Sequence, residues 1–226
     1  MSKNFNSKPW TPHRMRVLKE FITCTQVIIE KEGLDGVTIR KVAKLSDLNS
    51  ATIYNYFENL DHLIIFSIMD YIQEYIDDLP NWIKVENDAL ENFIGVWQCF
   101  AYHSLRKPDI YTKLFFSNLN NDINHYIEQY YQIFPIDLDG FPKYLIEMLT
   151  RTNVWRRSEA MIGMCVKEGK IRDEDKGDLN NITLYVFEGI LRRISMGKLE
   201  VEEGEKMFDK YLNKIVEVYK VPEDVN

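Results

Sequence analysis

Apolar residues recur every three or four positions through most of this chain. Val17, Phe21, Cys24 and Ile28 form the first such stripe. An apolar stripe at this spacing lies on one face of an α-helix, so the period predicts helices that bury that face against one another. No segment shows a sustained β-type alternation, and only 10 Gly and 7 Pro occur in 226 residues. We therefore expect an all-α fold.

Capping residues and helix breakers set the expected helix boundaries. Thr11-Pro12 opens the first helix and Gly33 ends it. Thr38 caps a short helix, and Asn49 caps another that continues to Tyr56. The longer helices expected after these cover about 60–79, 87–106, a segment from 108, a segment ending at 134, and then 143–168, 175–197 and 202–220. About ten helices follow from this pattern.

The charges divide the chain into a basic beginning and an acidic remainder. Residues 1–44 hold nine Lys/Arg and four Asp/Glu, a net +5, whereas the other 182 residues hold 19 and 31, a net −12. Such polarity orients a molecule toward a polyanion, although chance clustering on a solvated face gives the same count. We expect two domains: a compact head over residues 1–59 and a larger body over 60–226.

Several classes of protein fit the sequence poorly. No apolar stretch approaches the roughly 18 residues that suggest a membrane span, and residues 1–10 lack the apolar core of a secretion signal. The three cysteines have no CxxC spacing, which indicates reduced, mostly buried thiols and a cytoplasmic protein without a membrane partner. No phosphate loop, nucleophile elbow or HExxH motif occurs. We expect no enzyme activity, no cofactor and no metal.

Two short helices joined by a three- to four-residue turn have helix-turn-helix spacing. The second helix contains Thr38-x-Arg40-x-x-Ala43, and the third contains Thr52-Ile53-Tyr54-x-x-Phe57. Together with a first helix that ends at a glycine, these motifs resemble the head of the TetR family of bacterial transcriptional repressors over residues 14–64. The resemblance implies a three-helix head that binds DNA, followed by a larger helical body for ligand binding and dimerisation.

The resemblance also assigns roles within the head. A recognition helix enters the major groove by its N-terminus, so we expect Asn49, Ser50 and Ala51 at base edges. Arg40 matches a family position that reaches a base, and arginine suits guanine. The residues expected to contact phosphates, or to attract DNA without regard to sequence, are Thr38, Lys41, Lys44, Thr52, Tyr54, Asn55 and Tyr56. The alternatives are that Tyr54 and Tyr56 belong to the apolar core of the head, and that Arg40 is a solvated charge on an exposed turn.

One position departs from the family pattern. The family has a lysine that contacts phosphate at the start of the fourth helix, where this chain has Leu60. The amides at this helix N-terminus can hold a phosphate without that side chain, with His62 as a possible supplement.

The body is rich in aromatic residues, with polar residues between them. Helical aromatics usually form core, but many bulky rings in a bundle also leave an apolar cavity with a few orienting polar groups. The family resemblance implies an effector pocket there. The expected lining residues are Trp97, Phe100, Phe116, Tyr130, Glu147 and Trp155. We expect a small apolar or aromatic effector, with a cationic group as one option because Glu147 lies in an apolar stretch.

The last two helices carry stripes that suit an assembly surface. Leu184, Phe187, Leu191 and Ile194 recur at helical spacing, and Gly189 lies between them. Family members dimerise through such helices, although the stripes also suit packing within one chain. We therefore expect a homodimeric repressor that binds a near-palindromic double-stranded operator and responds to a ligand. The alternative is a DNA-binding regulator that activates transcription, or whose body binds a protein partner instead of a small molecule.

Overall fold

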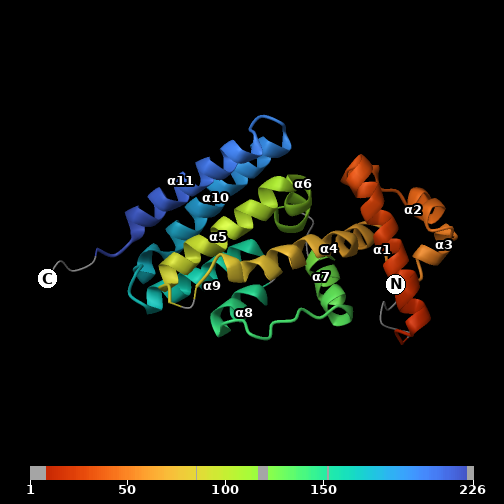
Figure 1. Ribbon diagram of the computed structural model, residues 1–226, viewed down its shortest axis with the longest axis horizontal. Coiled ribbons are helices and arrows are strands. Elements are labelled where there is room, and N and C mark those ends of the chain that lie inside the picture. The colour runs from red at the N-terminus through yellow and green to blue at the C-terminus, as the bar shows by residue number, and fades with distance from the viewer. Residues whose placement is uncertain (1–8, 85, 117–121, 152, 223–226) are drawn as a thin grey trace. The chain divides into compact units, whose positions relative to one another are not determined.

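The computed structural model of the protein describes residues 9–84, 86–116, 122–151 and 153–222, with the side chains of 122 and 123 left out (Figure 1). Within these residues the chain is helical, apart from loops and an isolated bridge between Ile171 and Lys220. The all-α prediction is confirmed. The α-helices are α1 (Pro12–Glu32), α2 (Ile39–Leu45), α3 (Ser50–Ile53), α4 (Leu60–Asp78), α5 (Ala89–Arg106), α6 (Pro108–Tyr111), α7 (Asp122–Ile133), α8 (Lys143–Leu149), α9 (Val154–Lys167), α10 (Lys176–Ser195) and α11 (Val201–Tyr219).

Short turns of other helix types connect some of these helices. They are the 3-10 turns Leu34–Gly36, Leu79–Asn81 and Asp173–Asp175 and a π-helical turn, Thr112–Phe116.

The predicted caps of the first three helices are present. The side-chain oxygens of Thr11, Thr38 and Asn49 each accept a hydrogen bond from a backbone N–H in the first turn of their helix, at 3.2, 3.3 and 2.8 Å. Each bond satisfies a donor that has no partner within the helix. Asp88 caps α5, close to the predicted start of this helix, and forms a capping box with Glu91.

Two predicted helices differ from those observed. The expected helix over 143–168 is interrupted between α8 and α9, because Asn153 caps a new helix and Arg157 binds the carbonyls of Leu149 and Arg151. The helix expected to reach Tyr56 ends at Ile53. It tightens there into a turn, in which the amides of Asn55 and Tyr56 donate to carbonyls three residues earlier.

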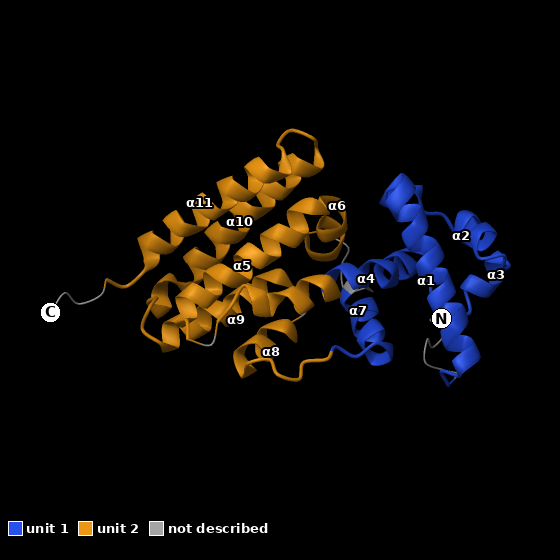
Figure 2. Cartoon of the chain, viewed as in Figure 1, with its two compact units in different colours: residues 1–72, 118–136 blue, residues 73–117, 137–226 orange. Residues whose placement is uncertain are grey.

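The chain forms two compact units, which Figure 2 colours separately. The first unit holds residues 1–72 and 118–136, and the second holds 73–117 and 137–226. The compact unit that contains the head therefore includes part of α4 and also α7. The predicted division of function at residue 59 stays a prediction, because a unit of packing is not a unit of function.

The first unit is built around buried aromatic rings. Phe21 of α1 lies 6.4 Å from Phe57, which lies 5.6 Å from Phe66 of α4, with the rings edge-on. Leu18 of α1 and Leu63 of α4 are completely buried as well. Each precedes one of these rings by three residues in the same helix. Burying an aromatic side chain of this size contributes a few kcal/mol to folding, so these rings fix the framework that carries α2 and α3.

The second unit packs α5 against α9, α10 and α11. Trp97 of α5, Phe187 of α10 and Phe208 of α11 form a buried trio with ring centroids 5.0 to 5.6 Å apart. Gly95 allows a close approach, because a Cβ there would lie 2.2 Å from the carbonyl oxygen of Trp82. Among the helices of the described segments, none has both the length and the apolar character to cross a membrane.

Candidate nucleic-acid interface and internal cavity

The turn between α2 and α3 sets the angle of a helix-turn-helix. It runs through Ser46–Asn49, and within the described residues Asp47 is the only non-glycine with a positive φ, 53°. The Leu48 amide closes the turn by donating to the Ala43 carbonyl at 3.1 Å. Val42 and Ile53 are fully buried beneath the two helices. The apolar side of each short helix is thus fixed, and its polar side faces solvent.

Most of the residues predicted to face DNA are on this open side. Tyr54 is the large aromatic among them, with 49% of its surface exposed. The exposed residues are Thr38, Arg40, Lys41, Lys44, Asn49, Ala51, Tyr54 and Asn55, and the half-buried ones are Ser50 and Thr52. Four of them, Arg40, Lys44, Asn49 and Ser50, line one shallow surface hollow. The structure therefore gathers two cations and the polar N-terminus of α3 at one place.

Lys41 differs from its two basic neighbours. Its ammonium pairs with the Glu32 carboxylate at 2.5 Å and donates to the Gly36 carbonyl at 2.9 Å. These contacts partly neutralise its charge. Arg40 and Lys44 have no ion-pair partner among the described residues, so of the three cations of α2 these are the two whose charge no carboxylate offsets.

Tyr56 lies in the framework rather than on the surface. It is buried, 5.7 Å from the Phe21 ring and 6.5 Å from the Trp10 ring. The Arg14 guanidinium lies over both Trp10 and Tyr56, 4.2 and 5.6 Å from the ring centroids, and donates to the Asn55 carbonyl at 3.5 Å. Sequence reasoning missed this cluster. The phosphate contact of Tyr56 stays a prediction, for a side chain that is only 9% exposed.

His62 is completely buried, which corrects the idea that it supplements a phosphate site. Its ring stacks on Tyr126 at 4.3 Å, and its Nδ1 accepts from the Glu58 amide at 3.2 Å. Burial, with a smaller contribution from His125, lowers the pKa of His62 to about 3. The imidazole is therefore neutral at physiological pH, and it offers no charge to DNA.

An internal cavity lies in the second unit between α4, α5, α8 and α9. The space between its lining atoms is about 350 Å³ including its opening to solvent, but only about 20 Å³ is wide enough for the centre of a water molecule. It is therefore a narrow slot rather than an open chamber. The lining residues are Tyr75, Phe93, Val96, Trp97, Phe100, Met148, Val154, Arg157, Ser158 and Met161.

The predicted lining residues fall into three groups. Trp97 and Phe100 line the cavity. Phe116 and Trp155 contact each other at 6.0 Å and do not line it. Tyr130 belongs to the first unit, where its hydroxyl donates to Asp70 at 3.1 Å.

The prediction that Glu147 lines the cavity is wrong. It is exposed and forms an ion pair with Arg151 at 3.0 Å, one turn away on the surface. This position removes the argument for a cationic effector. Sequence reasoning also missed the buried polar pair of the cavity, Arg157 and Ser158.

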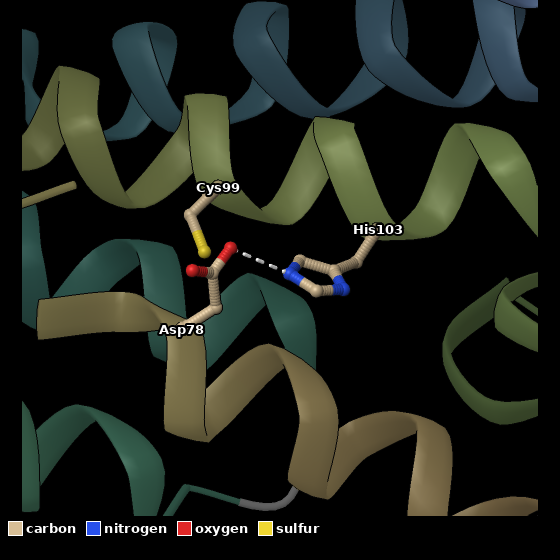
Figure 3. A group of neighbouring side chains, drawn as sticks. All are labelled: Asp78, Cys99 and His103. Atoms are coloured by element: carbon tan, nitrogen blue, oxygen red, sulfur yellow. Dashed lines mark hydrogen bonds and ion pairs between the residues drawn. The ribbon is translucent and has the colours of Figure 1, made fainter. Parts of the chain in front are cut away.

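A separate polar cluster joins α4 to α5. Asp78, Cys99 and His103 meet there, and each carries an atom able to bind a metal ion (Figure 3). The carboxylate of Asp78 already accepts from His103 at 2.9 Å and from Trp82 at 2.8 Å. Hydrogen bonds from Asn81, His103 and Trp82 hold the pKa of Asp78 below its usual range, while burial raises the pKa of the Cys99 thiol.

Both oxygens of the Asp78 carboxylate are already hydrogen-bonded, Oδ1 to Asn81 and Oδ2 to Trp82 and His103. We infer that the cluster holds α4 and α5 together. All three cysteines are free and buried, as predicted.

The two terminal helices pack against each other, and their main apolar stripes face inward. Leu184, Phe187, Leu191 and Ile194 are all buried within the second unit, so they are not the assembly surface that their spacing suggested. Other apolar side chains remain open. These are Ile182 and Tyr185 on α10 and Tyr211 and Val218 on α11, with Tyr185 63% and Val218 74% exposed.

Gly189 extends this open side of α10. It is exposed, and a Cβ added there would meet no atom within 4 Å. The spacing of residues 182, 185 and 189 places them on one face of the helix.

Comparison with known proteins finds likeness in structure alone. No model of a protein family matches the sequence, and no curated protein matches it. Among solved structures, FadR of Thermus thermophilus, a TetR-family transcriptional repressor in complex with lauroyl-CoA, has a TM-score of 0.58 at 12% identity, over 92% of this chain and 98% of that chain.

Two further solved structures give similar values. RolR in complex with resorcinol has a TM-score of 0.57 at 15% identity, over 92% of this chain and 89% of that chain. A regulator from Rhodococcus sp., described as TetR-family, has a TM-score of 0.55 at 10% identity, over 88% and 97%. At such low identities the likeness concerns the fold, and it extends over nearly the whole length of each chain.

Proposed function

Because the chain has the fold of the TetR family of transcriptional regulators, we propose that it is a DNA-binding transcriptional repressor. The observation that carries this proposal is the surface formed by α2 and α3. There Arg40, Lys44, Asn49 and Ser50 surround one hollow, while buried residues hold both helices from behind. A short helix that presents its polar N-terminus next to two free cations suits insertion into the major groove.

The residues of this surface divide by the kind of contact they make. Asn49, Ser50 and Ala51 begin α3 and reach base edges, and Arg40 binds a guanine. Lys44, Thr38, Thr52, Tyr54 and Asn55 bind phosphates and fix the register without reading sequence. Lys41 contributes less, because it is already paired with Glu32.

The open faces of α10 and α11 suit a homodimer interface. Exposed Tyr185, Tyr211 and Val218 supply apolar area, and Gly189 permits close approach of a second helix. A dimer with two-fold symmetry presents two heads to a near-palindromic operator, one for each half-site.

The cavity of the second unit is the proposed effector site. RolR and FadR, which share this fold, were each solved with a small ligand, and in this chain a slot lies between four helices of the body. A ligand that binds one conformation better shifts the population toward it, and a changed spacing of the two heads then releases the operator. Such a regulator acts in the bacterial cytoplasm, where the chromosome lies, and catalyses no reaction.

An activating output, or a protein partner in place of a small effector, is the alternative for the same DNA-binding head. Selection of DNA from a random pool by the purified full-length chain tests the shared premise. We expect enrichment of a site with two related half-sites, bound by a dimer. Enrichment of no sequence above the starting pool would contradict the proposal. A reporter fused to the selected site then separates repression from activation.

A further inference from the structure

The cavity of the second unit contains a buried cation that is only partly satisfied. Arg157 is 8% exposed and lines the slot. Its Nε donates to the carbonyl of Arg151 at 2.9 Å, and its Nη2 donates to the carbonyl of Leu149 at 3.3 Å. Its Nη1 has no hydrogen-bond partner among the described residues. A guanidinium has five N–H donors, so three of them have no acceptor in the segments that the structure describes.

Ser158 adds a second unsatisfied polar group to the same cavity. It is 6% exposed, it lines the slot next to Arg157, and its Oγ has no partner within the described part of the chain. Most buried polar side chains in native proteins are hydrogen-bonded, so each exception needs an explanation. Two neighbouring exceptions in one apolar cavity point to a common missing acceptor.

The charge of the site is also uncompensated. Arg157 forms no ion pair with an Asp or Glu of the described residues, and its guanidinium carbon lies 5.5 Å from the centroid of the uncharged Phe115 ring. A buried cation without an anion is costly, and removing it from water is tolerated best where a partner completes it. The two protein carbonyls hold the guanidinium in place without neutralising it.

From this geometry we infer that the cavity binds a small apolar carboxylate. This inference rests on the proposed function, since the bound compound is the effector of that regulator. The carboxylate accepts from the free N–H groups of Nη1 and Nη2 in a bidentate pair, and the Ser158 hydroxyl donates to the same group. The apolar part of the ligand lies among Phe93, Trp97 and Phe100, whose rings suit a flat or thin molecule.

The present slot is narrower than such a ligand. Met148 and Met161 line it, and methionine side chains change shape more readily than branched or aromatic ones. Binding therefore moves these two side chains, and with them α8 and α9. The same movement links ligand binding to the rest of the second unit.

Titration with matched pairs of acids and amides tests the inference. The probes are phenylacetate with phenylacetamide, and octanoate with octanamide, measured by calorimetry on the full-length protein near pH 7. Hydrogen bonds to a charged partner are strong, so at least one acid should bind about tenfold or more tightly than its amide. Equal affinities for acid and amide in both pairs, or no binding by any of the four probes, would overturn the inference.

Variants assign the selectivity to the pair of residues. Arg157→Gln should abolish the preference for the acid, whereas Arg156→Gln, an exposed neighbour on the same helix, should leave it unchanged. If Arg157→Gln fails to fold by circular dichroism, Arg157→Lys and Ser158→Ala take its place. Each should weaken acid binding by about threefold or more, and wild-type affinity in both folded variants would overturn the inference.

The selection of DNA described above keeps the two ideas apart. A protein that binds acids but selects no DNA refutes the repressor proposal and leaves the carboxylate site in place. A protein that selects DNA but does not distinguish acid from amide refutes the carboxylate site alone.

Discussion

The head and the body place their polar groups in opposite ways. In the head, Arg40, Lys44 and Asn49 are exposed and lie within ten residues of sequence, while the rings that support them are buried. In the body, Arg157 and Ser158 are buried in a cavity built from four helices. Exposed polar groups suit a large partner such as DNA, and enclosed polar groups suit a small molecule, as the two proposals require.

The division of the head into framework and reading surface predicts two kinds of variant. Phe21→Ala removes a fully buried ring and should destabilise the protein by about 3–5 kcal/mol in a denaturant titration. Tyr54→Ala removes an exposed ring and should change stability by less than about 0.5 kcal/mol while weakening DNA binding. Similar stability losses in both variants would break the distinction.

His62 sharpens the same division, because it is a titratable group within the framework. Its pKa of about 3 lies below the ordinary value of 6.5, so the unfolded chain binds a proton more readily than the folded one. Stability should therefore fall as the pH is lowered from about 6.5 toward 3, by on the order of a few kcal/mol.

The variant His62→Phe keeps a ring but cannot titrate. Its unfolding free energy should depend less on pH over that range than the wild-type value does. Parallel pH profiles for the two proteins would remove His62 as the cause.

The body offers its own contrast, between buried and open stripes of α10 and α11. Tyr185→Glu combined with Val218→Glu should give a folded monomer in sedimentation, because both side chains are exposed in one chain and lie on the proposed interface. Leu191→Glu should unfold the second unit instead, because Leu191 is buried within it. A dimer that survives the double change would move the interface elsewhere.

The smallest expected effect separates two neighbouring lysines of the head. Lys44→Ala should weaken binding to any DNA by about 1 kcal/mol and reduce the slope of log affinity against log salt by about one. Lys41→Ala should change both less, since its ammonium is shared with Glu32 and Gly36. Equal effects of the two substitutions would mean that DNA displaces the Glu32 contact.

Local patterns in the sequence predict the head better than the body. The caps Thr38 and Asn49 and the buried positions Val42 and Ile53 follow from spacing within about fifteen residues. Tyr56 is buried because its ring packs against Trp10 and Phe21. Local spacing in the sequence does not show this contact between distant segments.

In the body, the cavity depends on how four helices meet, so four of the six expected lining residues lie elsewhere. One local signal for the true lining existed. Arg157 and Ser158 occupy the helical face marked by Val154 and Met161, so a cation and a hydroxyl interrupt an apolar stripe.

The affinity of Arg40→Ala for selected and random DNA tests the central claim most directly, that the α2–α3 surface reads a specific sequence. If Arg40 binds a guanine, the substitution should cost about 1–3 kcal/mol on the selected site and much less on random DNA at the same salt concentration. Equal losses on the two DNAs would show that Arg40 contributes only general attraction, and would contradict the role of this surface as a reader of sequence.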